Sequence, residues 1–417
     1  MRVQPIQSRG AISTSAFPRS RAAALIATAC AACCTLPAVA QAQGKQVSVN
    51  VSNRLTYDAD VVLNDRRISG GRGKGDVSSS PSLDLDIYLP RATGSFYLQG
   101  GLGYVFYRKF TNLNRERINL SGGFDQKVLS DCIVHGGAQY SRQLSDIGDL
   151  PINAPVSGAA RNSQENRSVS ADIGCSGAIG IRPSVAVSRS ESRNTEFFRK
   201  LSDADTNTLT GQIGYSAPAL GVVSVFGRYS DSKYINRAAP NGQEDGVRSY
   251  SAGVQLERSV GTRLNFSGSV NYTSVKPYLS SVKSFSGVGY DLSGTYNGDL
   301  FRLTLSGSRA AQPSTILFVS YDIHTSLGLN ISSELTSRMD WHASASYNRR
   351  AFAPSTLFVG APTRGSENVY SLGAGITYRA GRRLNFSLDG SYSKRTTDSQ
   401  LIPYEQKRIS LTTSFSL

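Results

Sequence analysis

The chain has 417 residues, a formal net charge of +15 and a mean hydropathy of −0.25. After residue 42 no apolar run reaches the roughly 20 residues that a membrane-spanning helix needs, which excludes a helical membrane protein and leaves a soluble exported protein or a transmembrane β-barrel. The positive charge alone would suit nucleic acid, but an exported chain rarely meets it, so we expect no nucleic-acid partner.

Residues 1–42 have the pattern of a secretory signal peptide. Basic residues, among them Arg2 and Arg21, precede the apolar stretch AAALIATACAACC, and small residues alternate in AQA at 40–42. This order of basic, apolar and small residues is typical of a cleaved signal. An N-terminal membrane anchor is the alternative, although the apolar run is short for one. We therefore expect residues 43–417 to form the exported domain.

Apolar and polar residues alternate along the exported part. Leu83, Leu85 and Ile87 share one parity, whereas Asp84 and Asp86 share the other, which is typical of a strand with one apolar and one wet face. The pattern predicts about 18 strands, and 16 remain an alternative because the first strand and the region 283–310 are less regular. The expected strands are 47–62, 81–90, 95–109, 116–128, 131–143, 164–176, 180–191, 204–216, 221–232, 247–258, 262–274, 283–296, 299–310, 317–331, 337–349, 367–379, 382–395 and 405–417.

Short and long connectors alternate between these strands. The tight turns are 92–94, 129–131, 218–221, 259–262, 297–299 and 380–382, and the long polar connectors are 63–80, 144–163, 192–203, 233–246 and 350–366. Short turns at one end and long loops at the other are typical of outer-membrane barrels, with the loops outside the cell. We predict an all-β fold, a transmembrane antiparallel up-and-down β-barrel, with both termini on the short-turn side and hence an even strand number.

One phrase occurs three times, from Thr262, Ser337 and Arg382. In the first copy an aromatic residue, Phe266, is followed six positions later by Tyr272. Two aromatics of one parity at this spacing fit the two interfacial girdles of a membrane barrel. The alternative is that three strands resemble each other by composition alone.

Basic residues recur where strands leave the short turns. Arg263, Arg302, Arg338 and Arg383 fall near the expected periplasmic mouth, and rings of arginine favour anions in pores. Alternatively, each arginine lies at the membrane interface or balances a nearby carboxylate. The loop segment 64–75, rich in Arg and Gly, is a candidate contact for lipopolysaccharide phosphates.

Two histidines share the wet parity on neighbouring strands. His324 lies close to Asp322, and His342 lies close to Asp340. The hypothesis is a proton or metal site, and the alternative is a hydrated polar network in the lumen. Since no catalytic or phosphate-binding motif accompanies these residues, we expect no enzyme activity, no metal and no cofactor.

The exported part keeps two cysteines, Cys132 and Cys175. If Gln143 faces Gln164 across their hairpin, the same register places the two cysteines opposite each other. They then form a cross-strand disulfide oxidised in the periplasm. The alternative is a pair of free thiols facing lipid, because a slip of one residue separates them.

The last nine residues, ISLTTSFSL, alternate as a final strand. Phe415 and Leu417 share its apolar face. An apolar terminal residue is the expected signal for the barrel-insertion machinery, although an aromatic is commoner there.

The chain resembles the β-barrel porin type 2 family of Gram-negative outer membranes. The resemblance lies in Tyr57-Asp58-Ala59-Asp60-Val61, which is similar to the family's first strand with two departures, and in the segments 303–315 and 326–352. It implies an outer-membrane barrel and, through members similar to exopolysaccharide-secretion barrels, a link to polysaccharide export components. No residue-level site follows from it.

Three functions therefore remain. The first is a porin-like channel in the outer membrane, in contact with its lipid and lipopolysaccharide, for acidic exopolysaccharide or other anionic and polar solutes. The second is a structural or adhesive barrel with an occluded lumen. The third, which the missing motifs disfavour, is an outer-membrane enzyme.

Overall fold

Strands account for most of the chain that the computed structural model describes. The described residues are 44–71, 73–129, 131–150, 159–175, 179–238, 242–316, 319–354 and 365–417. Residues 46–417 form one compact unit, and the predicted signal peptide, 1–42, lies outside the described residues. In those ranges no helix has the length and apolar character needed to cross a membrane.

Eighteen strands are present in the described residues, where the sequence predicted about 18. They are β1 (Gln46–Asp58), β2 (Asp76–Arg91), β3 (Gly94–Tyr107), β4 (Arg115–Lys127), β5 (Cys132–Leu144), β6 (Ser163–Cys175), β7 (Gly180–Asn194), β8 (Ala204–Ala217), β9 (Gly221–Ala238), β10 (Glu244–Val260), β11 (Leu264–Pro277), β12 (Phe285–Asn297), β13 (Arg302–Pro313), β14 (Val319–Thr336), β15 (Met339–Pro354), β16 (Ser366–Arg379), β17 (Leu384–Thr397) and β18 (Tyr404–Ser416). The alternative of 16 strands is wrong.

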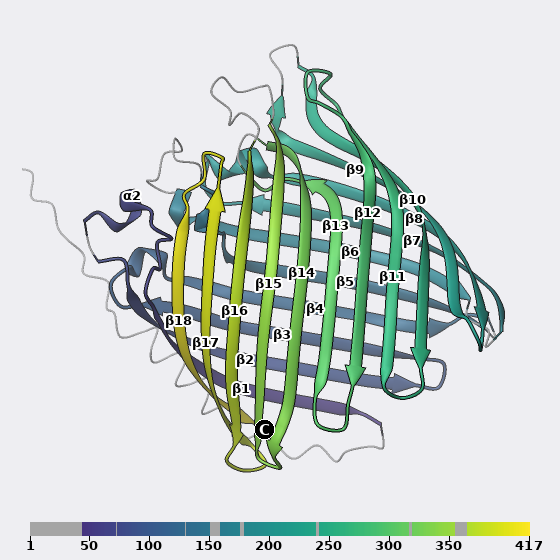
Figure 1. Cartoon of the computed structure of the whole chain (residues 1–417), viewed down its shortest axis with the longest axis horizontal. Coiled ribbons are helices and arrows are strands. Elements are labelled where there is room, and N and C mark those ends of the chain that lie inside the picture. The colour runs from purple at the N-terminus through teal and green to yellow at the C-terminus, as the bar shows by residue number, and fades with distance from the viewer. Residues whose placement is uncertain are drawn as a thin grey trace, which may run out of the picture. The chain divides into compact units, whose positions relative to one another are not determined.

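The strands form one closed antiparallel sheet. Each strand pairs with its neighbours in sequence, and β1 also pairs with β18, from Asn50 opposite Ser416 to Asp58 opposite Arg408. In Figure 1 the later strands cross in front of the earlier ones, as tilted strands of a barrel do. The predicted all-β barrel is confirmed. Closure leaves no free sheet edge, so every strand finds backbone partners on both sides.

The connectors separate by length. At one end of the barrel, the turn side, they contain two to four residues, as in 92–93 and 380–383; at the other, the loop side, they contain five to eighteen, the longest being 145–162. The first long connector differs from its prediction, because β2 begins at Asp76 and the connector is 59–75. Asp76 extends the strand because its carboxylate accepts hydrogen bonds from the backbone N–H groups of Lys109 and Phe110.

A one-turn helix, α2 (Arg66–Ser69), lies within this connector. The carboxylate of Asp65 accepts a hydrogen bond from the backbone N–H of Arg67, and Gly70 ends the turn in the left-handed region at φ 56°. An N-cap carboxylate and a left-handed glycine are the usual start and stop of a helical turn.

The two faces of the sheet differ in polarity. Apolar residues of one parity point outward and are exposed, for example Ile213 (60%), Leu305 (54%) and Leu372 (57%). A soluble protein would bury such a continuous belt, whereas lipid solvates it. The strands therefore span a membrane. In the first copy of the repeated phrase, Phe266 and Tyr272 both belong to this outer face, exposed by 38% and 59%.

Buried apolar side chains gather instead under the loops. One cluster contains Val61, Val62, Phe110 and Leu113, and it joins the connectors after β1 and β3, with Ile147 of the β5–β6 connector packed against it. Burial of these side chains holds the loops together over the barrel end, since each well-buried aliphatic or aromatic side chain contributes roughly 1.5–3 kcal/mol.

The register of β5 and β6 is the one that the sequence predicted. Gln143 faces Gln164, and Cys132 faces Cys175. In the structure the two sulfur atoms are bonded, with an S–S distance of 2.10 Å. The bond closes the turn side of this hairpin.

We expect the exported protein to contain this disulfide. Without reductant, the denatured protein should not react with a maleimide reagent, and the Cys132→Ser/Cys175→Ser variant should fold into the same barrel but unfold at lower denaturant. Closing a loop across a sequence separation of 43 residues restricts the unfolded chain by about 4 kcal/mol. Two maleimide adducts on the unreduced wild-type protein would contradict the assignment.

Candidate functional site

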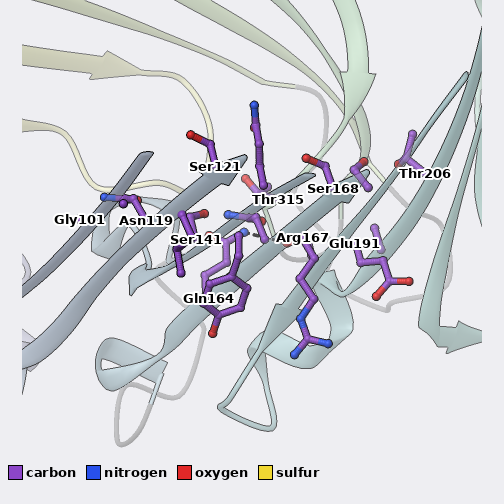
Figure 2. A pocket seen from close by; sticks show the side chains of 18 of the residues that line it. Gly101, Asn119, Ser121, Ser141, Gln164, Arg167, Ser168, Glu191, Thr206 and Thr315 are labelled. Carbon is purple, nitrogen blue, oxygen red and sulfur yellow. Dashed lines mark hydrogen bonds between the residues drawn. The ribbon is translucent and has the colours of Figure 1, made fainter. Parts of the chain in front are cut away.

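The lumen is the hydrophilic interior of the barrel, and one part of its wall is formed by β2–β8. There a cavity of about 790 Å³ is lined by hydroxyl and amide side chains. Figure 2 shows Ser121 and Ser168 on one side of the sheet, with Arg167 and Glu191 extending to the other side. The inward side chains of this wall are Asp84, Asp86, Gln99, Asn119, Ser121, Gln139, Ser141, Gln164, Asn166, Ser168, Ser190, Ser192 and Thr206. Such a wall can replace water around a hydroxylated solute.

A second cavity, of about 650 Å³, lies where β1 closes on β18. It is lined by three arginines, Arg54, Arg117 and Arg408, and by three aspartates, Asp58, Asp84 and Asp389. Arg408 pairs with Asp58 at 2.8 Å, and Arg54 Nε donates to Thr412 Oγ1 at 3.1 Å. Within the described ranges no carboxylate lies within 4.0 Å of a nitrogen of Arg54 or Arg117. Two exposed guanidinium groups therefore keep their full positive charge toward the lumen.

Small residues keep this cavity open between the arginines. Gly103 stands directly opposite Arg117, and an added Cβ at Gly103 would lie 3.0 Å from the carbonyl oxygen of Pro81. At Gly101 an added Cβ would lie 2.6 Å from Asp84 Oδ1. The glycines of β3 thus leave room in front of the charged groups.

The four arginines predicted from the sequence lie at the turn side of the barrel and not in this cavity. Arg263, Arg338 and Arg383 belong to the short turns, and Arg302 is the first residue of β13. Arg263 forms an exposed ion pair with Asp299 at 3.0 Å. These residues line the turn-side rim on separate hairpins, and the structure does not bring them around one cavity.

The two predicted histidines are also far apart. His324 faces Arg350 across the β14–β15 pair, whereas His342 faces Ser332. Eight residues of β15 therefore separate the two levels, which is roughly 26 Å along a strand. His342 Nε2 lies 3.1 Å from Asp389 Oδ1. The hypothesised joint Asp/His site does not form.

The acidic partners of that hypothesis are divided in the same way. Asp340 pairs with Arg379 at the turn side, and Asp322 is buried near the loop side. In the described part of the chain, no group of three His, Cys, Asp or Glu side chains could hold a metal ion.

A buried charge cluster, which we call the latch, closes part of the loop-side mouth. It consists of Asp149, Arg350, Glu367 and Arg395. Arg350 Nη2 donates to Asp149 Oδ1 at 2.6 Å, and Arg350 also pairs with Glu367. Arg395 Nη1 donates to Glu367 Oε2 at 3.2 Å. Glu367 and Arg395 are only 1% and 3% exposed, so the charges compensate each other away from water.

The latch joins opposite walls of the barrel. Asp149 ends the 3₁₀ helix η2 (Ile147–Asp149) in the β5–β6 connector, and Arg350 lies on β15, nine places from β6 in either direction of the ring. Arg395 Nη2 donates to the carbonyl of Gly148 at 2.8 Å, and Thr315 Oγ1 donates to Asp149 Oδ2 at 3.2 Å. Gly148 and Asp149 of this connector therefore reach across the mouth to β15 and β17, which narrows the path of any solute.

Burial and charge act in opposite directions on the two aspartates of this connector. Burial raises the pKa of Asp149, but Arg350, Arg199 and Arg395 outweigh it, so the pKa ends below its ordinary value. Asp146 is exposed, but partial desolvation by the surrounding loops raises its pKa, and the neighbouring Asp149 raises it further. Asp149 is thus held ionised, and Asp146 takes up a proton more readily than a free carboxylate.

Mild acid should not open the latch. A lowered folded pKa means that the contribution of Asp149 is present above its unfolded value, about 3.9, and is lost only as pH falls through the lower folded value. Protonation of Asp146 removes its repulsion from Asp149 and acts toward closure. We expect single-channel conductance not to rise between pH 7.5 and pH 5.0, with Asp146→Asn as the variant that removes the second effect. A conductance increase in that window would count against the latch.

The β9–β10 hairpin forms a second cover at the same mouth. Tyr234 Oη donates to the carbonyl of Ser320 at 2.7 Å and accepts from the backbone N–H of Ser314 at 2.8 Å. Arg237, 2% exposed, donates to the carbonyl of Val319 at 2.9 Å. The hairpin is thereby fixed to Ser314 in the β13–β14 connector and to the first residues of β14.

The latch and the second cavity were not predicted. Arg54 and Arg408 have inward parity and could have been found by it, but only the closure of β1 on β18 shows that they share a cavity. For Asp149 no periodic signal exists, because it lies in a connector and its partner Arg350 is 201 residues away.

Neither a protein-family model nor a curated protein matches the sequence. Solved barrels have low sequence identity to the chain. OccK2 (OpdF) of Pseudomonas aeruginosa in complex with glucuronate is 11% identical, covering 89% of this chain and 98% of that one, at a TM-score of 0.46. OccAB3 of Acinetobacter baumannii is 10% identical to this chain. The match covers 89% of this chain and 99% of OccAB3, at a TM-score of 0.45. The siderophore receptor PirA of Pseudomonas aeruginosa is 13% identical to this chain. The match covers 88% of this chain and 80% of the receptor, at a TM-score of 0.42.

Proposed function

We propose that the barrel is an outer-membrane channel for small anionic, polar solutes, with carboxylated sugars as the best-fitting class. The observation that carries this proposal is the pair of unpaired guanidinium groups, Arg54 and Arg117, in a lumen cavity of about 650 Å³. Basic groups in a pore attract anions and repel cations. The hydroxyl and amide wall beside them offers partners to a solute's hydroxyl groups.

The apolar belt supports a membrane position, and the sorting of the connectors supports the orientation. Short connectors face the periplasm and long ones the outside in barrels of this type. Outer-membrane location after signal cleavage, insertion through the C-terminal strand, the relation to porin type 2 proteins and the lack of enzyme activity all remain predictions consistent with this proposal.

Conductance of the refolded protein tests the channel. In planar bilayers with a KCl gradient we expect steady openings and a reversal potential that favours chloride. In liposome-swelling assays glucuronate should enter faster than glucose of similar size. Openings that favour potassium would refute the anion preference, and silence of both the wild-type protein and a latch variant would refute the channel.

A structural or adhesive barrel with an occluded lumen is the second candidate. The latch and the Tyr234–Ser314 contacts favour it, because both cover the loop-side mouth. The two candidates separate when the wild-type protein and Asp149→Ala are compared. Silence of the wild type with openings of the variant would indicate a barrel that is closed at rest.

Export of an acidic exopolysaccharide, with polysaccharide export components as partners, is a finer form of the first proposal. A uronic-acid polymer would meet the same hydroxyl, amide and arginine side chains, but the β5–β6 connector would have to leave the mouth. Deleting the gene and measuring surface polysaccharide tests it: an unchanged amount would remove the polymer from the solute class.

A further inference from the structure

Three basic side chains lie on the outer face of the barrel at its loop side. Arg309 is on β13, Arg349 on β15 and Lys394 on β17, each with the parity of the lipid-facing residues of its strand. We call these three residues the outer basic arc. They lie at the upper end of the apolar belt, where a membrane's headgroups begin.

The strand register places the arc in nearly one row. Thr325 of β14 stands opposite both Arg309 and Arg349. The two arginines are therefore two interstrand spacings apart, roughly 10 Å. Lys394 stands opposite Tyr370, one outward position lower on the sheet. Because strands in a barrel are tilted, such a step keeps the residues at a similar membrane depth.

The charges of the arc are not neutralised by carboxylates. In the ranges that the structure covers, no Asp or Glu oxygen lies within 4.0 Å of Arg309, Arg349 or Lys394, and the connector 355–365 contains no acidic residue. The buried Nε of Arg309 also has no hydrogen-bond partner. Glu405, which faces Lys394 in the register, pairs with Lys407 at 3.2 Å.

The opposite outer arc, on β4–β8, is built differently. There each arginine meets a carboxylate: Arg142 with Glu116 at 2.8 Å, Arg167 with Glu165 at 2.9 Å, Arg189 with Glu191 at 2.9 Å and Arg193 with Asp205 at 2.6 Å. That arc is balanced by its own acids, so the two sides of one membrane interface present different charge to the same lipids.

An apolar groove lies directly below the outer basic arc. Its volume is about 990 Å³, and it is floored by small residues such as Gly294, Gly307 and Ala345. Leucines and tyrosines form its walls, and Tyr347 and Tyr370 lie with ring centroids 5.1 Å apart. A groove of this kind suits acyl chains, and tyrosines at its upper rim suit the interface.

We propose that the outer basic arc and the groove below it bind one phosphorylated glycolipid of the outer leaflet, the lipid anchor of lipopolysaccharide. Phosphates meet Arg309, Arg349 and Lys394, and acyl chains enter the groove. The choice of occupant rests on the proposed outer-membrane location, which places the loop side in the outer leaflet. Charge complementarity separates this occupant from a second copy of the chain, whose identical arc would be repelled.

Binding of defined lipids to the full-length refolded protein in non-ionic detergent tests the site. Native mass spectrometry would compare bisphosphorylated lipid A with its dephosphorylated form and with phosphatidylglycerol. The wild-type protein should retain bisphosphorylated lipid A, and Arg309→Gln/Arg349→Gln/Lys394→Gln should weaken retention at least tenfold. Equal retention of the dephosphorylated lipid or of phosphatidylglycerol would overturn the glycolipid assignment.

The matched control removes charge from the balanced arc. Arg167→Gln/Glu165→Gln and Arg189→Gln/Glu191→Gln should retain lipid A as the wild type does. Heat-dependent gel migration verifies folding of each variant, and Lys394→Gln alone serves if the triple variant fails to fold. A triple variant that retains lipid A fully, or a dimer that replaces lipid at this face, would refute the site. Conductance measured in phosphatidylcholine bilayers is independent of lipid A, so failure of the channel proposal is seen separately.

Discussion

Replacing Asp149 with alanine is expected to raise single-channel conductance and to admit larger solutes. Asp149 is the residue through which the β5–β6 connector holds Arg350 on the opposite wall, at 2.6 Å. Removing one partner of a buried ion pair costs about 3–5 kcal/mol, because the other charge stays buried. A loss of about 3 kcal/mol lowers the ratio of closed to open connector roughly 150-fold. Arg350 keeps Glu367, so the barrel wall itself should remain folded.

The measurement is conductance in planar bilayers together with liposome swelling by sugars of increasing size. Asp299→Ala is the matched control, because it removes a carboxylate from an exposed ion pair at the turn side, where such pairs contribute about 1 kcal/mol or less. The Asp149→Ala/Arg350→Ala variant should behave like the single variant or open further. If Asp149→Ala conducts as the wild type does, the connector does not limit passage.

The second large effect concerns ion preference. Arg54→Gln/Arg117→Gln should move the reversal potential in a KCl gradient toward potassium, because the variant removes the two unpaired positive charges of the lumen cavity. Neither arginine is paired with a carboxylate in the described residues, so the substitution leaves no acid stranded. Arg408 stays in place because Asp58 depends on it.

Salt concentration sharpens this test. At 0.1 M the Debye length is about 10 Å, and at 1 M it is about 3 Å. The difference between wild type and variant should therefore shrink at high salt. Arg263→Gln/Arg338→Gln removes the same charge from the turn-side rim and should shift the potential less. An equal shift from the rim variant would place the ion selectivity at the turn-side rim, where the sequence analysis expected it.

The alternation of apolar and polar residues predicts well which side chains face outward or inward. It does not predict how far along the barrel axis a residue lies. The alternation of Leu83 and Asp84 predicts an outer and an inner side, and the assumed pairing of Gln143 with Gln164 is enough to place Cys132 opposite Cys175. His324 and His342 were correctly given one face, yet they lie eight residues apart in level. Parity repeats every second residue, so it carries no information about which row a residue occupies.

The site depends on what periodicity lacks. Arg54 and Arg408 line one cavity only because the last strand closes on the first. Asp149 reaches Arg350 through a connector whose Ile147 packs against the buried side chains of Val62 and Phe110. Such long-range contacts depend on the whole ring. An analysis of each strand by itself could therefore predict the barrel, but not the contacts across its lumen and its loop-side mouth.

The cross-strand bond of Cys132 and Cys175 has a consequence for the far end of its hairpin. Thirteen facing residue pairs of β5 and β6 lie between that bond and the pair Leu144–Ser163, after which the connector with Asp149 begins. A disulfide at the turn side prevents β5 from shifting its register against β6. The level at which the β5–β6 connector leaves the barrel wall is thus fixed from the turn side, so the redox state of these two cysteines would affect how far Asp149 reaches across the loop side.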